Sequence, residues 1–328
     1  MSAKSAIGWT DATWPIVAGC TYESPGCSNC WAVRDSWRLA HNPHAKVRAA
    51  FDGVVRKTDD GKLVWTGVVR PIPERLAWPL QWTLPRRVFV CSQSDLFHDL
   101  VPDAFIDQTF AVMALATRHT FQVLTKHPAR ALAYMTARGL PGRWADAARE
   151  VGDRLRVKHS AGVEEGLRGG WHTPLSNVWF GVTAEDQRRA EERVAILHQI
   201  PARVRWISAE PMLERLDVRR LLRLCAGTMG DPIDQTIDWL VCGGESAQTR
   251  VNTRPFDLDW ARDLRDQCRA AGTRFFMKQL GTRPQAEDPA VPLMGQVPLA
   301  PPEGRSSRYK WHEPERWPAD LRVQEFPQ

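Results

Sequence analysis

The segment Arg87-Val-Phe-Val-Cys-Ser92 has an uninterrupted apolar centre from Val88 to Val90. A strand with one solvated face alternates apolar and polar residues, so a continuous apolar run indicates a strand buried on both faces, as in a parallel sheet. Comparable runs recur along the chain. They lie at residues 13–19, 64–70, 120–125, 177–183, 203–208, 237–243 and 274–279.

Helical patterns separate these runs. Residues 102–118, 186–199 and 257–271 carry apolar residues at helical spacing, and Thr183-Ala-Glu-Asp186 matches a capping box ahead of the second of them. Alternation of strand and helix predicts βαβ units and a parallel sheet. Eight such units predict an α/β fold, either a (β/α)8 barrel or a partial TIM-type barrel. A doubly wound sheet is the alternative, but no glycine-rich turn follows the first strand.

The chain has 328 residues, of which 43% are hydrophobic and 25% charged, so it can bury a full core and is not intrinsically disordered. No apolar run reaches membrane-spanning length, and the first residues lack a secretion signal, so a cytoplasmic protein without a membrane partner is expected. We expect one barrel domain over residues 1–281 with a polar insertion at 139–176. A Pro-rich extension over 282–328 is expected to wrap the barrel.

The strongest chemical signal is Cys20-Thr-Tyr-Glu-Ser-Pro-Gly-Cys27-Ser-Asn-Cys30, directly after the first predicted strand. The Cys-x2-Cys pair can reach one metal from a single turn, and Cys20 can fold back across the Pro-Gly turn. The carboxyl end of a barrel strand is also where such folds carry their chemistry. Three sulfur ligands favour a [4Fe–4S] cluster with one open iron. A zinc site completed by a distant ligand, and idle thiols, are the alternatives.

Four further cysteines are expected to be small core residues. They are Cys91, Cys225, Cys242 and Cys268.

A three-cysteine cluster after the first strand of a β/α barrel resembles the radical S-adenosylmethionine (radical SAM) superfamily. The usual spacing there is Cys-x3-Cys-x2-Cys with an aromatic residue before the last cysteine. Here the first gap is six residues long, and Asn29 precedes Cys30. The resemblance implies a [4Fe–4S] cluster on Cys20, Cys27 and Cys30, with S-adenosylmethionine as the second cofactor.

A second resemblance covers nearly the whole chain and is to a phage-associated family of unknown function. It is carried by the wide cysteine spacing and by residues 7–14, 92–98, 124–126, 181–183, 243–246 and 276–279. The middle third is also distantly similar to spore photoproduct lyase, because an Asp-aromatic-polar segment and a strand ending in Thr-Lys follow one another there. That similarity implies radical chemistry on nucleic acid, by analogy.

Polar residues and glycines directly follow the predicted strands, as at an active-site rim, and we expect them to contact a cofactor or substrate. They are Ser92, Asp95, His98, Lys126, Glu210, Gly243, Gly244 and Glu245. Asp95 and His98 suit binding of an amino group or proton transfer, with a helix cap as the alternative. Glu210 suits ribose hydroxyls or a solvated turn. The glycine pair would let backbone N–H groups approach a ligand.

These features favour a radical SAM enzyme whose catalytic residues are unknown. The net charge of +6 favours DNA or RNA as substrate. A reductase and a protein encoded by a neighbouring gene are the expected partners. One alternative is a zinc-stabilised nucleic-acid-binding protein without catalysis. The other is a barrel hydrolase that uses Glu210 and Glu245 as paired carboxylates.

Overall fold

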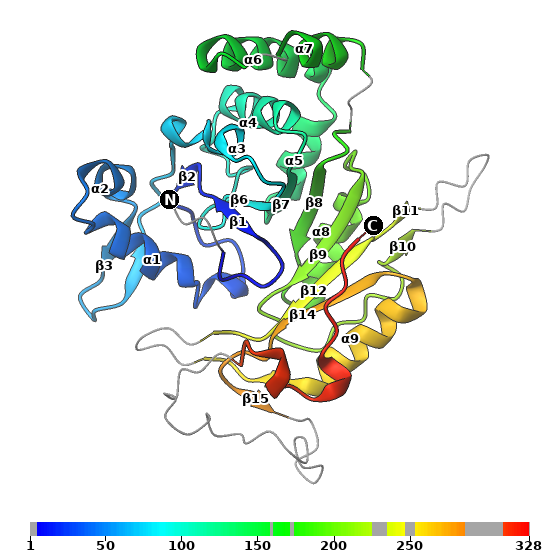
Figure 1. Ribbon diagram of the computed structural model, residues 1–328. Helices are drawn as coiled ribbons and strands as arrows, with labels where there is room; N and C mark the ends of the chain where they lie inside the picture. The colour runs from blue at the N-terminus through cyan, green and yellow to red at the C-terminus, as the bar shows by residue number, and fades with distance from the viewer. Residues whose placement is uncertain are drawn as a thin grey trace. The chain divides into compact units, whose positions relative to one another are not determined.

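The computed structural model describes residues 5–157, 160–170, 174–224, 235–246, 253–285 and 311–327 (Figure 1). The fold is α/β, as predicted, and seven strands form the main sheet in the order β1-β6-β7-β8-β9-β12-β14. Their bounds are Ala12–Trp14, Arg87–Val90, Thr120–Thr125, Val178–Thr183, Val204–Ala209, Trp239–Gly243 and Arg274–Gln279. The order ends at β1 and at β14, so the described strands form an open half-barrel. A closed eight-stranded barrel is not shown.

The predicted sheet strand at residues 64–70 is wrong, which accounts for seven strands instead of eight. Its first part is β4 (Leu63–Trp65), which forms an antiparallel hairpin with β3 (Val55–Lys57). All three β4 residues are only half-buried, so this segment never enters a two-sided layer. Gly67, at φ +88°, then turns the chain. The remainder is β5 (Arg70–Pro71), which pairs with β2 (Val17–Ala18).

The three predicted helices are confirmed. α4 (Asp103–Leu115) is almost wholly buried. α8 (Gln187–Leu197) is capped by Asp186, whose side chain accepts the Arg189 N–H at 2.8 Å. The capping box predicted at 183–186 is therefore wrong, because Thr183 is the last residue of β8 and the cap lies three residues later. α9 (Leu258–Ala271) ends at Gly272, a left-handed C-cap with φ +75°. Within the described residues, no helix combines the length and the apolarity that crossing a membrane requires.

The chain divides into two compact units. The first comprises Met1–Glu23, Ala32–Gly181 and Gln199–Arg203, and the second comprises Ser24–Trp31, Val182–His198 and Val204–Gln328. In the first unit, β1, β6 and β7 run parallel. In the second unit, β9, β12 and β14 run parallel. The carboxyl ends of the strands therefore meet at one edge of the sheet within each unit.

The first unit holds most of the helices and the 139–176 insertion. Smaller elements are α1 (Trp31–Ala40, whose first residue belongs to the second unit), α2 (Ala45–Phe51), η2 (Pro73–Arg75), α3 (Trp78–Gln81) and α5 (Pro128–Met135). The insertion was expected to be a loop, but its described residues form α6 (Leu140–Leu155) and α7 (Ser160–Arg168). Trp144 of α6 stacks on Phe110 of α4 at 4.7 Å, so the insertion is docked through an apolar contact.

The second unit holds the end of the chain. Its smaller elements are η1 (Pro25–Cys27), β10 (Arg223–Leu224), β11 (Gln235–Thr236), β13 (Phe256–Asp257), β15 (Pro284–Gln285), η3 (Pro314–Arg316) and η4 (Ala319–Leu321). Residues 311–327 lie against β14, where the Met277 N–H donates to Val323 O at 2.8 Å. Trp311 and Trp317 are buried there. This segment covers the edge of β14; the rest of the extension, 286–310 and 328, lies outside the described residues.

Candidate functional site

Six cysteines lie in the described part of the chain. Cys91, Cys242 and Cys268 are buried in the core, as predicted, whereas Cys225 lies outside the described residues. Burial raises the pKa of the Cys91 thiol to about 12 and also raises the pKa values of Cys242 and Cys268. These three thiols therefore stay protonated and unreactive.

The other three cysteines, Cys20, Cys27 and Cys30, are only half-buried. Cys20 belongs to the first unit, and Cys27 and Cys30 lie in the second unit on residues 24–30, here called the cysteine loop. Cys27 donates its N–H to Ser24 O at 2.8 Å, and Cys30 donates to Cys27 O at 3.2 Å. Neither unit alone contains all three thiols. Among the residues that the structure describes, no three Cys, His, Asp or Glu side chains gather as metal ligands.

A buried ion pair at the end of β8 supports the cysteine loop. Glu185 follows β8 and is fully buried, and its Oε2 lies 2.9 Å from Nη1 of Arg193 on α8. Arg193 also donates to Thr183 O at 2.8 Å. The other carboxylate oxygen of Glu185 accepts the Gly26 N–H at 3.4 Å. Since a buried charge requires such pairing, Glu185 fixes the loop to the end of β8.

A second acidic residue holds the same loop from β12. Glu245 is buried, and both of its carboxylate oxygens accept from Nε of Arg254, at 3.1 and 3.2 Å. Its Oε2 also accepts from Nδ2 of Asn29 at 2.9 Å. Arg254 in turn donates from Nη1 to Pro25 O at 2.9 Å. The predicted cofactor contact Glu245 is therefore engaged in positioning the cysteine loop.

A third ion pair spans strand β12 at its carboxyl end. Lys278 of β14 places Nζ 2.7 Å from Oε1 of Glu210, which directly follows β9. Because β12 lies between these two strands, the pair meets over Gly243, where a Cβ would stand 2.9 Å from Oε1 of Glu210. Ser208 donates to Oε2 of Glu210 at 3.3 Å. The glycine thus makes room for the ion pair, and Lys278 keeps 23% of its side chain exposed.

A glycine is required at position 244 because neighbouring atoms leave no room for a side chain. A Cβ there would lie 2.5 Å from Leu280 O and 2.8 Å from the Phe256 ring. Gln279 donates from Nε2 to Gly244 O at 2.9 Å and to Oγ of Ser246 at 2.7 Å. These contacts fix the turn that carries Glu245 away from β12.

In the first unit, Asp95 connects the ends of β6 and β7. It is buried, and its Oδ1 accepts from the Phe97 N–H at 2.9 Å and from Oγ1 of Thr125 at 2.8 Å. Its Oδ2 accepts from the Lys126 N–H at 2.7 Å. Asp95 does not cap α4, whose N-cap is Pro102 without a side-chain bond. Its carboxylate instead fixes two loops through their backbone and one hydroxyl.

His98 lies beside the residue that follows Cys20. Its Nδ1 accepts the Leu100 N–H at 3.2 Å, so the neutral ring carries its proton on Nε2 and donates to Oγ1 of Thr21 at 3.0 Å. Burial, and then the nearby His127, lower the pKa of His98, while Asp95 opposes the shift. The imidazole is therefore held in one neutral tautomer.

The remaining predicted residues of the first unit are half-buried. Ser92 lies in the turn after Cys91, a non-glycine residue at φ +55°, and Lys126 presents its side chain where β7 ends. The first unit thus gathers Ser92, Asp95, His98 and Lys126 at the ends of β6 and β7. The second unit gathers Glu210, Gly243, Gly244 and Glu245 with Cys27 and Cys30.

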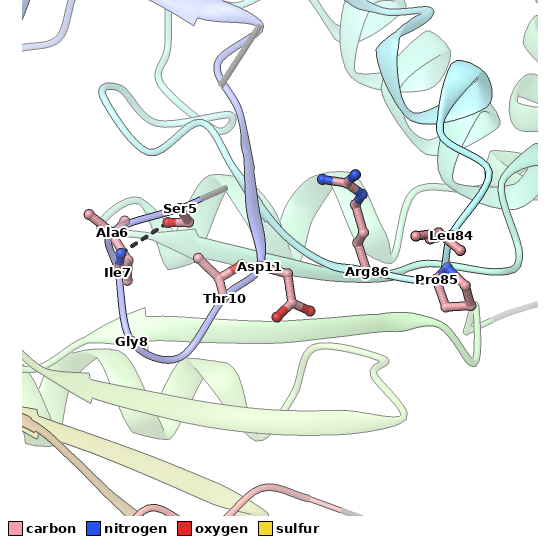
Figure 2. Close-up of a pocket in the computed structure, with 9 residues that line it drawn as sticks. All are labelled: Ser5, Ala6, Ile7, Gly8, Thr10, Asp11, Leu84, Pro85 and Arg86. Atoms are coloured by element: carbon pink, nitrogen blue, oxygen red, sulfur yellow. Dashed lines mark hydrogen bonds between the residues drawn. The ribbon is translucent and has the colours of Figure 1, made fainter. Parts of the chain in front are cut away.

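A pocket with a volume of about 430 Å³ lies at the opposite, amino ends of β1 and β6. Figure 2 shows the residues around it. Ser5, Ala6, Ile7, Gly8, Thr10, Asp11, Leu84, Pro85 and Arg86 line it. Asp11 forms an ion pair with Arg87 at 3.0 Å, and the hydrogen bond from Arg87 holds the pKa of Asp11 below its usual range. In β/α folds this end contributes to stability and the opposite end to catalysis, so we do not assign the pocket to the predicted site.

The family of the chain follows from a comparison with family models. The model described as protein of unknown function (DUF5131) matches residues 4–318. The chain belongs to the DUF5131 family. The predicted membership of a family of unknown function is thereby confirmed over nearly the whole DUF5131 chain. No curated protein and no solved structure matches it.

Sequence reasoning missed two functional cations of this DUF5131 chain, Arg193 and Arg254. Arg193 had a detectable signal, since it lies at helical spacing among the apolar residues Ala190, Val194 and Leu197 of α8. A cation on a buried helix face requires an anion, which points to the nearby Glu185. Arg254 gave no signal, because it lies outside any helix or strand, two residues before β13, and pairs with Glu245 only through the fold.

Proposed function

We propose that this protein is an iron–sulfur enzyme of the radical SAM type, with a [4Fe–4S] cluster held by Cys20, Cys27 and Cys30. The observation that carries the proposal is the contrast between two sets of cysteines. Three are buried with raised pKa values, and three are half-buried in the stretch of chain between β2 and α1. Half-buried thiols at Cys-x2-Cys spacing are suited to ligate iron, whereas buried neutral thiols are not.

The chemistry of the donors fits the cluster. Iron–sulfur clusters take cysteine thiolates, and a set of three leaves one iron open to a further ligand. Such a cluster, when bound, supplies the electron for reductive cleavage of S-adenosylmethionine, whose radical product abstracts a hydrogen atom from the substrate. The chain's own part is to hold the loop, to orient the polar groups of the cofactor and to exclude water.

The contacts divide the predicted cofactor residues into two roles. Asp95 and Glu245 act as positioning residues, because their carboxylate oxygens already accept bonds from loops and from Arg254. Glu210 and Lys278 are the better candidates for direct contact with ligand. Their pair is partly exposed above Gly243, and it offers one anion and one cation to the amino, carboxylate or hydroxyl groups of a cofactor.

No contact favours the hydrolase alternative. It requires Glu245 as the second carboxylate, but both oxygens of Glu245 already accept from Arg254, and Oε2 also accepts from Asn29. The zinc alternative shares its ligands with the proposal, so metal content decides between them.

The test is anaerobic reconstitution of the full chain with ferrous iron and sulfide. We expect a brown protein with roughly four irons per chain, as a [4Fe–4S] cluster requires. Cys20→Ala, Cys27→Ala and Cys30→Ala should each lose most of the iron. Cys268→Ala is the matched control, because it removes a buried thiol and should retain the iron. Reduction in the presence of S-adenosylmethionine should release 5′-deoxyadenosine and methionine.

Two results would overturn the proposal. One is a folded, anaerobic sample without iron. The other is one zinc per chain that depends on Cys27 and Cys30, which would assign the zinc-stabilised alternative. A Lys278→Met variant then tests the assigned ligand contact. It should keep the iron and lose cofactor cleavage.

A further inference from the structure

The positive charge of the chain is concentrated in one short segment. The whole chain has 44 basic and 38 acidic residues, a net charge of +6. Residues 31–58 contain six basic residues against two acidic ones, which leaves +4 of the +6 in this segment. The six are Arg34, Arg38, Lys46, Arg48, Arg56 and Lys57.

This segment forms the larger part of a small packed body, residues 32–65, here called the basic lobe. Phe51, Val54 and Val55 form its core together with Ala18 and Ile72, and Trp37 and Trp65 pack against it. Figure 1 shows its elements α1, α2 and β3 side by side. The six cationic side chains named above and Lys62 are all exposed on the surface of this lobe. The lobe therefore presents its cations from a fixed scaffold.

Other exposed helices of the chain intersperse the two signs of charge. On α8, Arg188 pairs with Glu192 at 2.7 Å, and on α9, Arg262 pairs with Asp259 at 2.6 Å. α2 carries Lys46 and Arg48 and has no acidic residue. The whole lobe has seven basic residues and four acidic ones, and one of the acids, Asp35, is bound by Arg38. Three further acids, Asp52, Asp59 and Asp60, are exposed on the lobe, so its surface carries an excess of three positive charges.

We propose that the basic lobe binds the phosphate backbone of a nucleic acid. Exposed Arg and Lys side chains on a fixed scaffold are the chemistry that contacts phosphates without reading sequence. The lobe follows Cys30 directly in the chain, since α1 begins at Trp31. The bound nucleic acid would be the substrate of the enzyme proposed above. Its role as substrate rests on that proposed function, whereas the binding itself does not.

The experiment uses the full chain without reconstitution and a fluorescein-labelled duplex DNA, with binding followed by anisotropy over a salt series. The slope of log affinity against log salt concentration is negative, and each lost phosphate contact reduces its magnitude by about 0.9. Arg56→Gln combined with Lys57→Gln should therefore reduce the magnitude of the slope by about 1.8. Lys46→Gln with Arg48→Gln should act in the same direction.

The control is Arg188→Gln with Arg269→Gln. This variant also removes two positive charges, but from exposed sites on α8 and α9. It should leave the slope unchanged. Absence of DNA binding, or equal weakening by lobe and control variants, would overturn the proposal. The binding assay needs no cluster, so the two proposals can fail separately. A chain that binds DNA but takes up no iron would overturn only the radical SAM function. A chain that takes up iron but does not bind DNA would overturn only the role of the lobe.

Discussion

The two units fix the carboxyl ends of their strands by different means. In the first unit, Asp95 accepts two backbone N–H groups and one hydroxyl, and His98 holds Thr21 as a neutral ring. In the second unit, three carboxylates follow three strands, and each is paired with a cation. The pairs are Glu185–Arg193, Glu210–Lys278 and Glu245–Arg254.

The contacts of the three pairs distinguish residues that support the cysteine loop from residues that are candidates for contact with a ligand. Two of the second unit's pairs contact the cysteine loop, at Gly26 through Glu185 and at Asn29 through Glu245. The third pair, Glu210–Lys278, is partly exposed over Gly243. A carboxylate after a strand is therefore not by itself a ligand contact. Its remaining hydrogen-bonding capacity decides whether it positions a loop or meets a substrate.

The largest effect is expected from breaking the buried pair of the second unit. Arg193→Ala leaves the carboxylate of Glu185 buried without a cation, which costs about 3–5 kcal/mol of unfolding free energy. Asp95→Asn in the first unit replaces an acceptor by a donor toward backbone N–H groups and should cost about 1–3 kcal/mol. Urea unfolding of both variants measures the difference.

Arg188→Ala on the exposed side of α8 is the control and should change stability by less than about 0.5 kcal/mol. If Arg193→Ala were no worse than this control, the buried pair would not support the cysteine loop. A double replacement, Glu185→Leu with Arg193→Met, should recover much of the lost stability, since apolar residues can replace a buried ion pair.

Most of the fold could be predicted because its signals are local. The apolar runs at 120–125 and 274–279 coincide with β7 and β14, and the helix over 257–271 is α9 within one residue. The failure at 64–70 has a physical reason. An apolar run of that length fits either a buried strand or a half-buried hairpin, and only the long-range pairing of β4 with β3 distinguishes them.

The candidate site was only partly predictable for a related reason. The residue types after the strands are visible in the sequence, but the partner that engages each one is not. Glu245 and Glu210 look alike along the chain, and the pairing of Glu245 with Arg254 and Asn29 separates them only after folding. Positioning residues and candidate ligand contacts can therefore be told apart only by their hydrogen-bond partners, which are distant in sequence.

A smaller effect is expected at the glycine pair. Gly244→Ala places a Cβ 2.5 Å from a backbone oxygen, Leu280 O, and should cost about 1–3 kcal/mol, because backbone has to move. Gly243→Ala meets Oε1 of Glu210, the end of a flexible side chain rather than backbone, so it should cost less and displace the ion pair with Lys278 instead. Urea unfolding separates the variants. Equal losses would contradict the assignment of Gly243 to the ion pair.

The smallest effect is the pH dependence that His98 adds to the first unit. Its folded pKa lies below the ordinary value of 6.5, mainly because of burial, so the unfolded chain takes up the proton first as pH falls. The stabilisation is complete above about pH 6.5 and declines as pH falls toward the folded pKa. His119 and His198 are shifted in the same direction. The wild-type unfolding midpoint should therefore fall on acidification.

His98→Asn tests the share of His98, because the Asn oxygen can still accept the Leu100 N–H but the side chain does not titrate. The variant should lose less stability than the wild type between about pH 7 and pH 5, a window around the ordinary histidine pKa. His41→Asn, an exposed change on the basic lobe, should leave the wild-type pH profile unchanged. An identical pH profile for His98→Asn and wild type would mean that the contact with Thr21 holds the first unit equally well whether or not the ring is charged. The neutral state of His98 would then make no contribution to stability.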